Sequence, residues 1–142
     1  MLRYKAAALI TVNKSIYRDN TPEQVLAWHA DQGAWWSSSR HDDSLFNGQI
    51  VFVRYAGTNE VIGRASVINH QGEDAPNEHD PELKWRYAFE FLSREPVRGV
   101  YLRDFGITGG RARQGLIGLR HAEGQAIGAA LDDRPTHAPS HA

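Results

Sequence analysis

The chain of 142 residues contains 41% hydrophobic and 23% charged residues, no cysteine, and carries a formal net charge of −1 with neutral histidines. This length accommodates one hydrophobic core, and the composition is that of an ordinary folded domain. The lack of cysteine excludes a disulfide framework, a thiolate nucleophile and cysteine-ligated zinc, and the balanced charge gives no sign of bulk electrostatic binding to nucleic acid.

The N-terminal part predicts a strand and then a helix. Residues 4–12 are apolar and end in β-branched side chains, as in a strand buried on both faces. Thr21 at the N-cap, Pro22 at the first helical position and Gln24 three residues after the cap predict a helix with a capping box. Gly33 is expected to end that helix.

The same N-terminal stretch bears on location. No small-residue cleavage site follows it, so it is read as a strand and not as a signal peptide. No apolar run approaches the roughly 20 residues that span a membrane. We therefore expect a cytoplasmic protein without a membrane partner.

A loop and a β-hairpin are predicted next. Residues 34–43, AWWSSSRHDD, show neither a helix nor a strand period and are read as a loop. Asn47-Gly48 predicts a tight turn. The runs 49–56 and 61–69 alternate on either side of a turn, as the two strands of a hairpin do.

Further strands and a last helix follow. After a polar loop at 71–81, residues 84–93 alternate as a strand and 97–102 predict a short one. Residues 106–118 are read as a loop rich in glycine and arginine, and 119–131 as the final helix.

These elements predict an α+β fold, with a small, strongly curved sheet or pseudo-barrel of about five to six strands flanked by helices. Residues 1–131 are expected to form the domain. The tail at 132–142 is poor in apolar residues and is read as disordered or as the start of a linker.

Catalytic and metal motifs are not found. The seven histidines are scattered and lack the spacing of a metal site, and GITGGRARQG lacks the Lys-Ser/Thr of a phosphate-binding loop. Ser37, Ser38 and Ser39 stand near His41 and Asp42, but the G-x-S-x-G elbow of serine hydrolases is missing. We expect no metal, no cofactor and no enzymatic activity of this domain, with a Ser/His hydrolase as the least favoured alternative.

An aromatic and serine-rich segment gives the first functional signal. Trp35 and Trp36 lie outside any amphipathic period, so both do not easily face the core, and an exposed tryptophan usually stacks on a partner. Ser37, Ser38 and Arg40 add hydrogen bonds and a phosphate contact, a combination that suits a nucleobase. Alternatively, one tryptophan is core and the other covers an end of the sheet.

A local excess of arginine gives the second signal. Between residues 98 and 120 five arginines stand against Asp104 alone: Arg98, Arg103, Arg111, Arg113 and Arg120. Arginine beside glycine binds phosphates through guanidinium groups and main-chain N–H groups. The alternative is a solvated loop.

In their order and spacing, the motifs resemble the EVE domain of the PUA-like superfamily. The matching pieces are YKAAALITV, GAWWSSS, NGQIVFVRYAG, VIGRASVI, WRYAFEF and RQGLIGLRHAEGQAIGAAL, which together span residues 4–131. EVE and the related YTH, ASCH and SRA-like domains are pseudo-barrels that hold a nucleotide in an aromatic pocket. Bacterial EVE-like domains are often joined to nucleases and read modified cytosine in DNA, whereas YTH-like relatives read methylated adenine in RNA.

The resemblance also implies site residues. Trp35, Trp36, Ser37 and Ser38 match the tryptophan-containing turn that lines the pocket. The aromatic strand is matched by Trp85 and Tyr87, and Tyr55 on the preceding hairpin is counted with them. The basic turn before the last helix is matched by Arg111, Arg113 and Gln114.

We therefore expect a DNA-binding reader of 5-methylcytosine or a related modified cytosine, which flips the base into an aromatic pocket. Its partner would be modified double-stranded DNA, and its setting a modification-dependent restriction system with a nuclease domain in cis or in trans. An RNA or modified-nucleoside sensor that uses the same pocket is the alternative.

Overall fold

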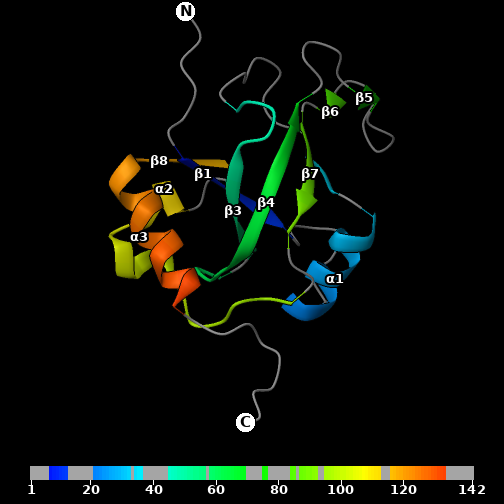
Figure 1. The fold of residues 1–142 in the computed structure, drawn as a ribbon. Coiled ribbons are helices and arrows are strands. Elements are labelled where there is room, and N and C mark those ends of the chain that lie inside the picture. Colours follow the sequence, from blue (N-terminus) through cyan, green and yellow to red (C-terminus); the bar gives the residue numbers. More distant parts are fainter. Residues whose placement is uncertain are drawn as a thin grey trace, which may run out of the picture.

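A mixed β-sheet with helices on both faces forms the centre of the protein (Figure 1). The computed structural model describes residues 7–12, 21–32, 34–36, 45–56, 58–69, 75–76, 84–85, 87–92, 95–112 and 116–133. Its elements are β1 (Ala7–Val12), α1 (Pro22–Gln32), β2 (Ala34–Trp36), β3 (Ile50–Tyr55), β4 (Val61–Asn69), β5 (Ala75–Pro76), β6 (Lys84–Trp85), β7 (Tyr87–Phe91), the 3₁₀ helix η1 (Leu102–Phe105), α2 (Gly109–Ala112), β8 (Leu116–Leu119) and α3 (His121–Asp132). The predicted α+β class is confirmed.

The main sheet has six strands in the order β2-β7-β4-β3-β1-β8, within the predicted range of five to six. β1 and β3 are parallel, whereas the other neighbouring strands are antiparallel. Within the described ranges the outer strands β2 and β8 do not pair with each other, so the sheet is open, which is compatible with the predicted curved sheet. β5 and β6 form a separate pair.

Two apolar layers pack on the sheet. The first lies between the sheet and α1, where Val25 and Leu26 of the helix meet Phe89 of β7. The second lies on the other face, where Ile127 of α3 packs with Phe52 of β3. Figure 1 shows α1 on one side of the sheet and α3 on the other. Apolar side chains on both faces of the strands therefore pack against helices, which gives three layers: helix, sheet and helix.

The capping box predicted for the first helix is confirmed. The Thr21 N–H donates to Gln24 Oε1 at 2.9 Å, and the Gln24 N–H donates to Thr21 Oγ1 at 3.3 Å. Two N–H groups that an α-helix leaves unpaired at its start are thereby satisfied. The helix begins at Pro22 and ends at Gln32, as the sequence indicates.

The prediction of a loop at 34–43 is wrong for its first three residues. Ala34–Trp36 form β2, an edge strand that pairs antiparallel with β7. Three residues are too few to display a two-residue period, so only the pairing with β7 identifies the strand. Residues 37–43 lie outside the described ranges.

The C-terminal third also differs from expectation. Residues 97–102 do not form a strand: Tyr101 makes one bridge with Glu60, and the chain then turns into η1. Residues 106–118 are not one loop, because they contain α2 and most of β8. The final helix starts at His121, since Leu119 belongs to β8 and pairs with Ala7 of β1.

A buried arginine attaches α2 to the sheet. Arg54 on β3 is 5% exposed, and its Nε and Nη2 donate to Thr11 Oγ1 at 3.1 and 2.9 Å. Its Nη1 donates to the backbone carbonyl of Ala112. Burial lowers the pKa of Arg54, but a guanidinium stays charged at neutral pH. This charge holds the end of α2 against the centre of the sheet.

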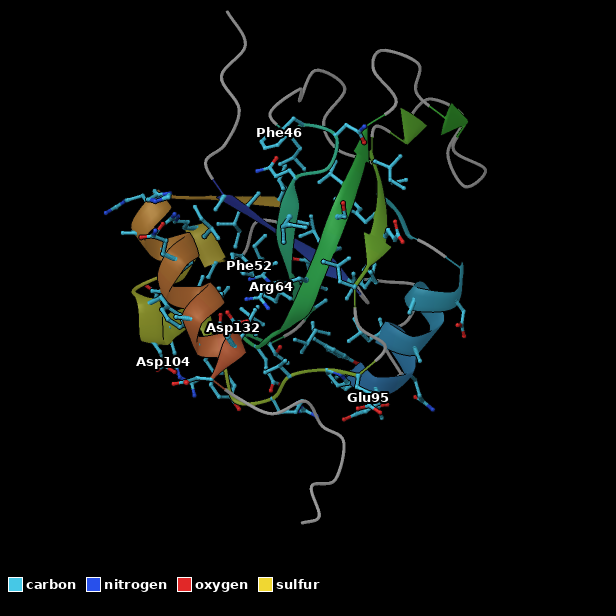
Figure 2. All side chains as sticks on the ribbon, in the orientation of Figure 1. Phe46, Phe52, Arg64, Glu95, Asp104 and Asp132 are labelled. Atoms are coloured by element: carbon cyan, nitrogen blue, oxygen red, sulfur yellow. The ribbon has the colours of Figure 1, made fainter. Side chains whose placement is uncertain are left out.

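A second arginine fastens the end of α3. Nη2 of Arg64 donates to Asp132 Oδ1 and to the carbonyl of Gly128, both at 2.9 Å, and its guanidinium lies 5.9 Å from the centroid of the Phe52 ring (Figure 2). Asp132 was expected to begin a disordered tail, but it is the last residue of α3. Residues 134–142 lie outside the described ranges.

Candidate functional site

Strand pairing aligns two of the aromatic positions predicted for a binding pocket, Trp36 and Tyr87, at the outer edge of the sheet. Trp36 of β2 lies directly opposite Tyr87 of β7, and Tyr87 lies opposite Asn69 of β4. Trp35 shares the next cross-strand row with Ala88 and Ile68. The pairing of β2 with β7 therefore brings segments separated by about a third of the chain to one end of the sheet.

Exposed apolar side chains lie at that same end. Phe46, Ile50 and Ile68 are 42%, 46% and 44% exposed. Ile50 lies opposite Ser66, so Ile68 is its diagonal neighbour on the same face, about 7–8 Å away. By register, Trp35 shares the face of Ile68, whereas the Trp36–Tyr87 row next to it belongs to the opposite face. We call the end of the sheet that carries Phe46, Ile50, Ile68 and the Trp36–Tyr87 pair the aromatic end. It is the upper end in Figure 1, and Figure 2 labels Phe46 there.

The exposed apolar side chains are not spread evenly. Among the residues whose side chains the structure describes, four large apolar side chains are highly exposed. Three of these four belong to the aromatic end. The fourth, Leu92, is 52% exposed but follows the opposite end of β7, where its N–H donates to the carbonyl of Arg64. Single exposed apolar residues are ordinary, whereas a group at one end of a sheet is typical of a binding surface.

Two other predicted aromatic residues have different positions. Trp85 of β6 precedes Tyr87 by two residues and pairs with Ala75 of β5, beside the aromatic end. Tyr55 lies apart, because it pairs with Val12 at the other end of β3 and is only 9% exposed in the core.

Several other predicted site residues lie outside the described ranges. They are Ser37, Ser38, Arg40, Arg113 and Gln114, together with Ser39, His41 and Asp42 of the hydrolase alternative. Their roles stay predictions.

Arg111 is placed far from the aromatic end and is already bound. It belongs to α2, and its Nη2 donates to the carbonyl of Gly118 in β8 at 2.8 Å. β8 and β2 are opposite edges of the sheet, five strand spacings or about 24 Å apart. The structure therefore does not bring Arg111 together with the tryptophan pair.

The positive charge of the arginine-rich segment is smaller than its sequence indicates. Nε and Nη2 of Arg98 donate to the buried carboxylate of Glu60 at 2.9 and 3.1 Å, and its Nη1 donates to Glu23 at 3.0 Å. The hydrogen bond with Glu60 raises the pKa of Arg98. Arg103 lies over the ring of Tyr101, 4.4 Å from its centroid. Carboxylates outside the segment thus neutralise part of its charge.

Glu123 of α3 neutralises Arg111. Nη1 and Nη2 of Arg111 donate to its two carboxylate oxygens at 2.7 and 2.6 Å, and the Arg120 N–H donates to Oε1 at 2.8 Å. The hydrogen bond from Arg111, aided by that from Arg120, lowers the pKa of Glu123 to about 2. The bidentate pair joins α2 to the start of α3.

This pair predicts a pH-dependent stability. Because the pKa of Glu123 is lower in the folded protein than its ordinary value of 4.5, its contribution is complete above pH 4.5 and is lost as the pH falls towards 2. Glu123→Gln should cost on the order of 1 kcal/mol at pH 7, since solvent screens a pair whose Arg111 side chain is 33% exposed. Urea unfolding at several pH values between 2 and 5 measures the free energy of unfolding. This free energy should depend less on pH in the variant than in the parent protein.

Glu90→Gln, at an exposed position of β7, is the matched control. Its free energy of unfolding should depend on pH as that of the parent protein does. A Glu123→Gln curve parallel to that of the parent would show that the Arg111–Glu123 pair does not contribute to stability.

Metal and membrane features were searched in the same ranges. The described histidines and carboxylates nowhere gather in a group of three that could hold a metal ion. None of the described helices has the length and apolarity needed to cross a bilayer.

Sequence reasoning missed Phe46, Ile50 and Ile68. A hint existed for Phe46, a large apolar residue directly before the Asn47-Gly48 turn. Ile50 and Ile68 carry no such signal, because the sequence does not show which part of this face of the sheet α3 leaves uncovered.

The comparisons with known proteins address the fold. The NMR structure of Rpa0253 from Rhodopseudomonas palustris, a structural genomics target, is similar to this chain with a TM-score of 0.57 and 15% sequence identity, covering 95% of this chain and 99% of that one. No protein-family model and no curated protein matches the sequence. At 15% identity the likeness establishes a shared fold, so any function must be argued from the site.

Proposed function

We propose that the protein binds nucleic acid and reads a modified base at the aromatic end of the sheet. The ligand we infer is 5-methylcytosine or a related modified cytosine in double-stranded DNA, with a nuclease in cis or in trans as the effector. The observation that supports the proposal is the strand register, which pairs Trp36 with Tyr87 and places Trp35 in the row of Ile68, at the end of the sheet where Phe46, Ile50 and Ile68 are exposed.

The energetics of base binding fit such a surface. Extruding a base from a duplex costs a few kcal/mol, and stacking on an aromatic side chain returns about 1–3 kcal/mol. A methyl group buried against an apolar neighbour adds about 0.8 kcal/mol. Because this last contribution is small, we expect discrimination between the modified and the unmodified base to be modest.

Phosphate contacts would come from outside the aromatic end. Arg40 and Arg113 remain the candidates from the sequence, since the guanidinium of Arg111 is held by Glu123 and Gly118. Removing one phosphate contact should weaken the binding of modified and unmodified DNA alike. It should also reduce, by about one, the slope of the logarithm of the binding constant against the logarithm of the salt concentration.

A binding panel tests the proposal. It compares a duplex with one 5-methylcytosine, the unmodified duplex, the corresponding RNA and free 5-methyl-deoxycytidine, each by fluorescence anisotropy or calorimetry. We expect the modified duplex to bind best. Tighter binding of RNA or of the free nucleoside would favour the sensor alternative, and no binding to any of the four would contradict the proposal.

Substitution of Trp36 locates the site. Trp36→Ala should weaken binding of the modified duplex at least tenfold, about 1.4 kcal/mol, because one stacking surface is lost. Trp36→Phe should retain most of the affinity, and Leu92→Ala should retain all of it because Leu92 follows the far end of β7. Far-UV circular dichroism confirms that each variant is folded. An unchanged dissociation constant for folded Trp36→Ala would place the site elsewhere.

A further inference from the structure

Strand β8 forms an edge of the sheet, and the pairing of β1 shows which backbone groups of β8 point outward. Among the described strands, β8 pairs with β1 alone and is the last in the sheet. In β1, the carbonyl of Val12 accepts the Ala56 N–H at 2.8 Å, so the backbone groups of Val12 point towards β3. Successive residues of a strand point to opposite edges, so Leu9 points the other way, towards its partner Ile117 in β8.

Leu116 and Gly118, on either side of Ile117, therefore point their backbone groups away from β1, along the outer edge of β8. An independent contact agrees with this assignment. The carbonyl of Gly118 accepts a hydrogen bond from Nη2 of Arg111, a residue of α2, at 2.8 Å. Outward N–H and C=O groups on an edge strand pair readily with a strand of another chain unless a side chain blocks them.

The guanidinium of Arg111 lies on this edge and is itself held in place. Its Nη1 and Nη2 donate to the two carboxylate oxygens of Glu123 at 2.7 and 2.6 Å, and the side chains of Arg111 and Glu123 are only 33% and 14% exposed. A strand added at the edge would lie about 4.8 Å from β8, in the space that the guanidinium occupies at Gly118. Displacing the guanidinium would break its charge-assisted bonds to Gly118 and Glu123 together.

We propose that Arg111 is a guard that prevents β8 from pairing with β8 of a second copy of this chain. A second copy is the partner because the edge is complementary to itself. A two-fold axis at Ile117 would set Leu116 of each copy opposite Gly118 of the other, so that outward backbone groups meet. The strand reads LIGL and contains no charged residue that would repel its own copy.

Arg111→Ala tests the guard, because it removes the guanidinium and leaves the backbone of β8 intact. Sedimentation velocity over a series of protein concentrations should show a dissociation constant for self-association at least tenfold below that of the parent protein, about 1.4 kcal/mol. Arg103→Ala is the matched control: it removes an exposed arginine of η1 with the same change in net charge, and should behave as the parent protein does. Arg111→Met, which keeps an apolar stem, replaces Arg111→Ala if circular dichroism shows that the alanine variant does not fold.

Amide hydrogen exchange identifies the surface that associates. In Arg111→Ala, the N–H groups of Leu116 and Gly118 should become more protected as the protein concentration rises, because they enter the new ladder of hydrogen bonds. Adding Gly118→Pro removes an outward N–H and no bond to β1, since proline is tolerated where the N–H of an edge strand faces outward. The double variant should therefore return to the self-association of the parent protein.

Three results would overturn the proposal. Self-association of the folded Arg111 variant no tighter than that of the parent protein would show that Arg111 does not guard the edge. Tighter association without added protection at Leu116 and Gly118, or one that persists in the folded double variant, would assign the contact to another surface. An equal gain in Arg103→Ala would attribute the effect to the lost charge.

Discussion

Phe89→Ala is expected to lower the free energy of unfolding by about 3–5 kcal/mol, because it removes a large buried ring from the core and leaves a cavity. Phe89 is 1% exposed and packs in the layer between the sheet and α1. It lies opposite Ala34 of β2 on one side and Val67 of β4 on the other. The same ring therefore supports the strand that carries Trp35 and Trp36.

Urea denaturation followed by circular dichroism measures this effect. The midpoint should fall while the slope stays unchanged, since the loss is one of packing. Leu92→Ala, just beyond the end of β7 and 52% exposed, should change stability by less than about 0.5 kcal/mol. A Phe89→Ala loss below about 1 kcal/mol would contradict the position of Phe89 in the core.

Two glycines of α3 should respond to the same substitution in opposite directions. A Cβ atom at Gly124 would lie 2.7 Å from the Cβ of Ala7 on β1, so either the helix or the strand must move. At Gly128, one turn later, the nearest atoms would be Arg64 Nη2 at 3.5 Å and Phe52 Cζ at 3.7 Å, which are ordinary contacts. Gly124→Ala should destabilise by about 1–3 kcal/mol through overpacking. Gly128→Ala should be neutral or stabilise by up to about 1 kcal/mol through helix propensity.

Thermal or urea unfolding of both variants provides the check, and each variant is the other's control for helix propensity. Equal effects at the two positions would mean that α3 does not approach β1 as closely as described. The comparison is sensitive because the helix sits on the sheet through small residues, and one added methyl group is enough to separate them.

The sequence predicts well those helices and strands that are stabilised by contacts between residues close together in the chain. The start of α1 depends on Thr21 and Gln24, which contact each other across three residues, and the hairpin of β3 and β4 is formed by adjacent segments. These were predicted close to their observed bounds. β2 and β8 were missed because a three- or four-residue strand has little period of its own and exists only through its partners β7 and β1.

In the candidate site too, some features are visible in the sequence and others depend on contacts between distant segments. An out-of-period tryptophan pair is visible in the sequence, but the position of Trp36 opposite Tyr87 depends on pairing between strands about a third of the chain apart. The charge of the arginine-rich segment was overestimated because Glu60 and Glu23, which bind Arg98, come from 38 and 75 residues away. A count within one window cannot include such partners, whereas folding brings them together.

The position of β1 between β3 and β8 has a consequence for the synthesis of the protein. Leu9 lies opposite Phe52 on one side and Ile117 on the other, so the strand made first is completed only by the strand made last. At roughly 5–20 residues per second, a ribosome needs about 5–20 s to pass from one to the other. During that time one hydrogen-bonding edge of an apolar strand stays open, and an open edge of this kind recruits strands from other chains. Nascent chains stalled before residue 116 should therefore depend on chaperones or be degraded, whereas in the full-length chain the short strand β8 covers this edge of β1.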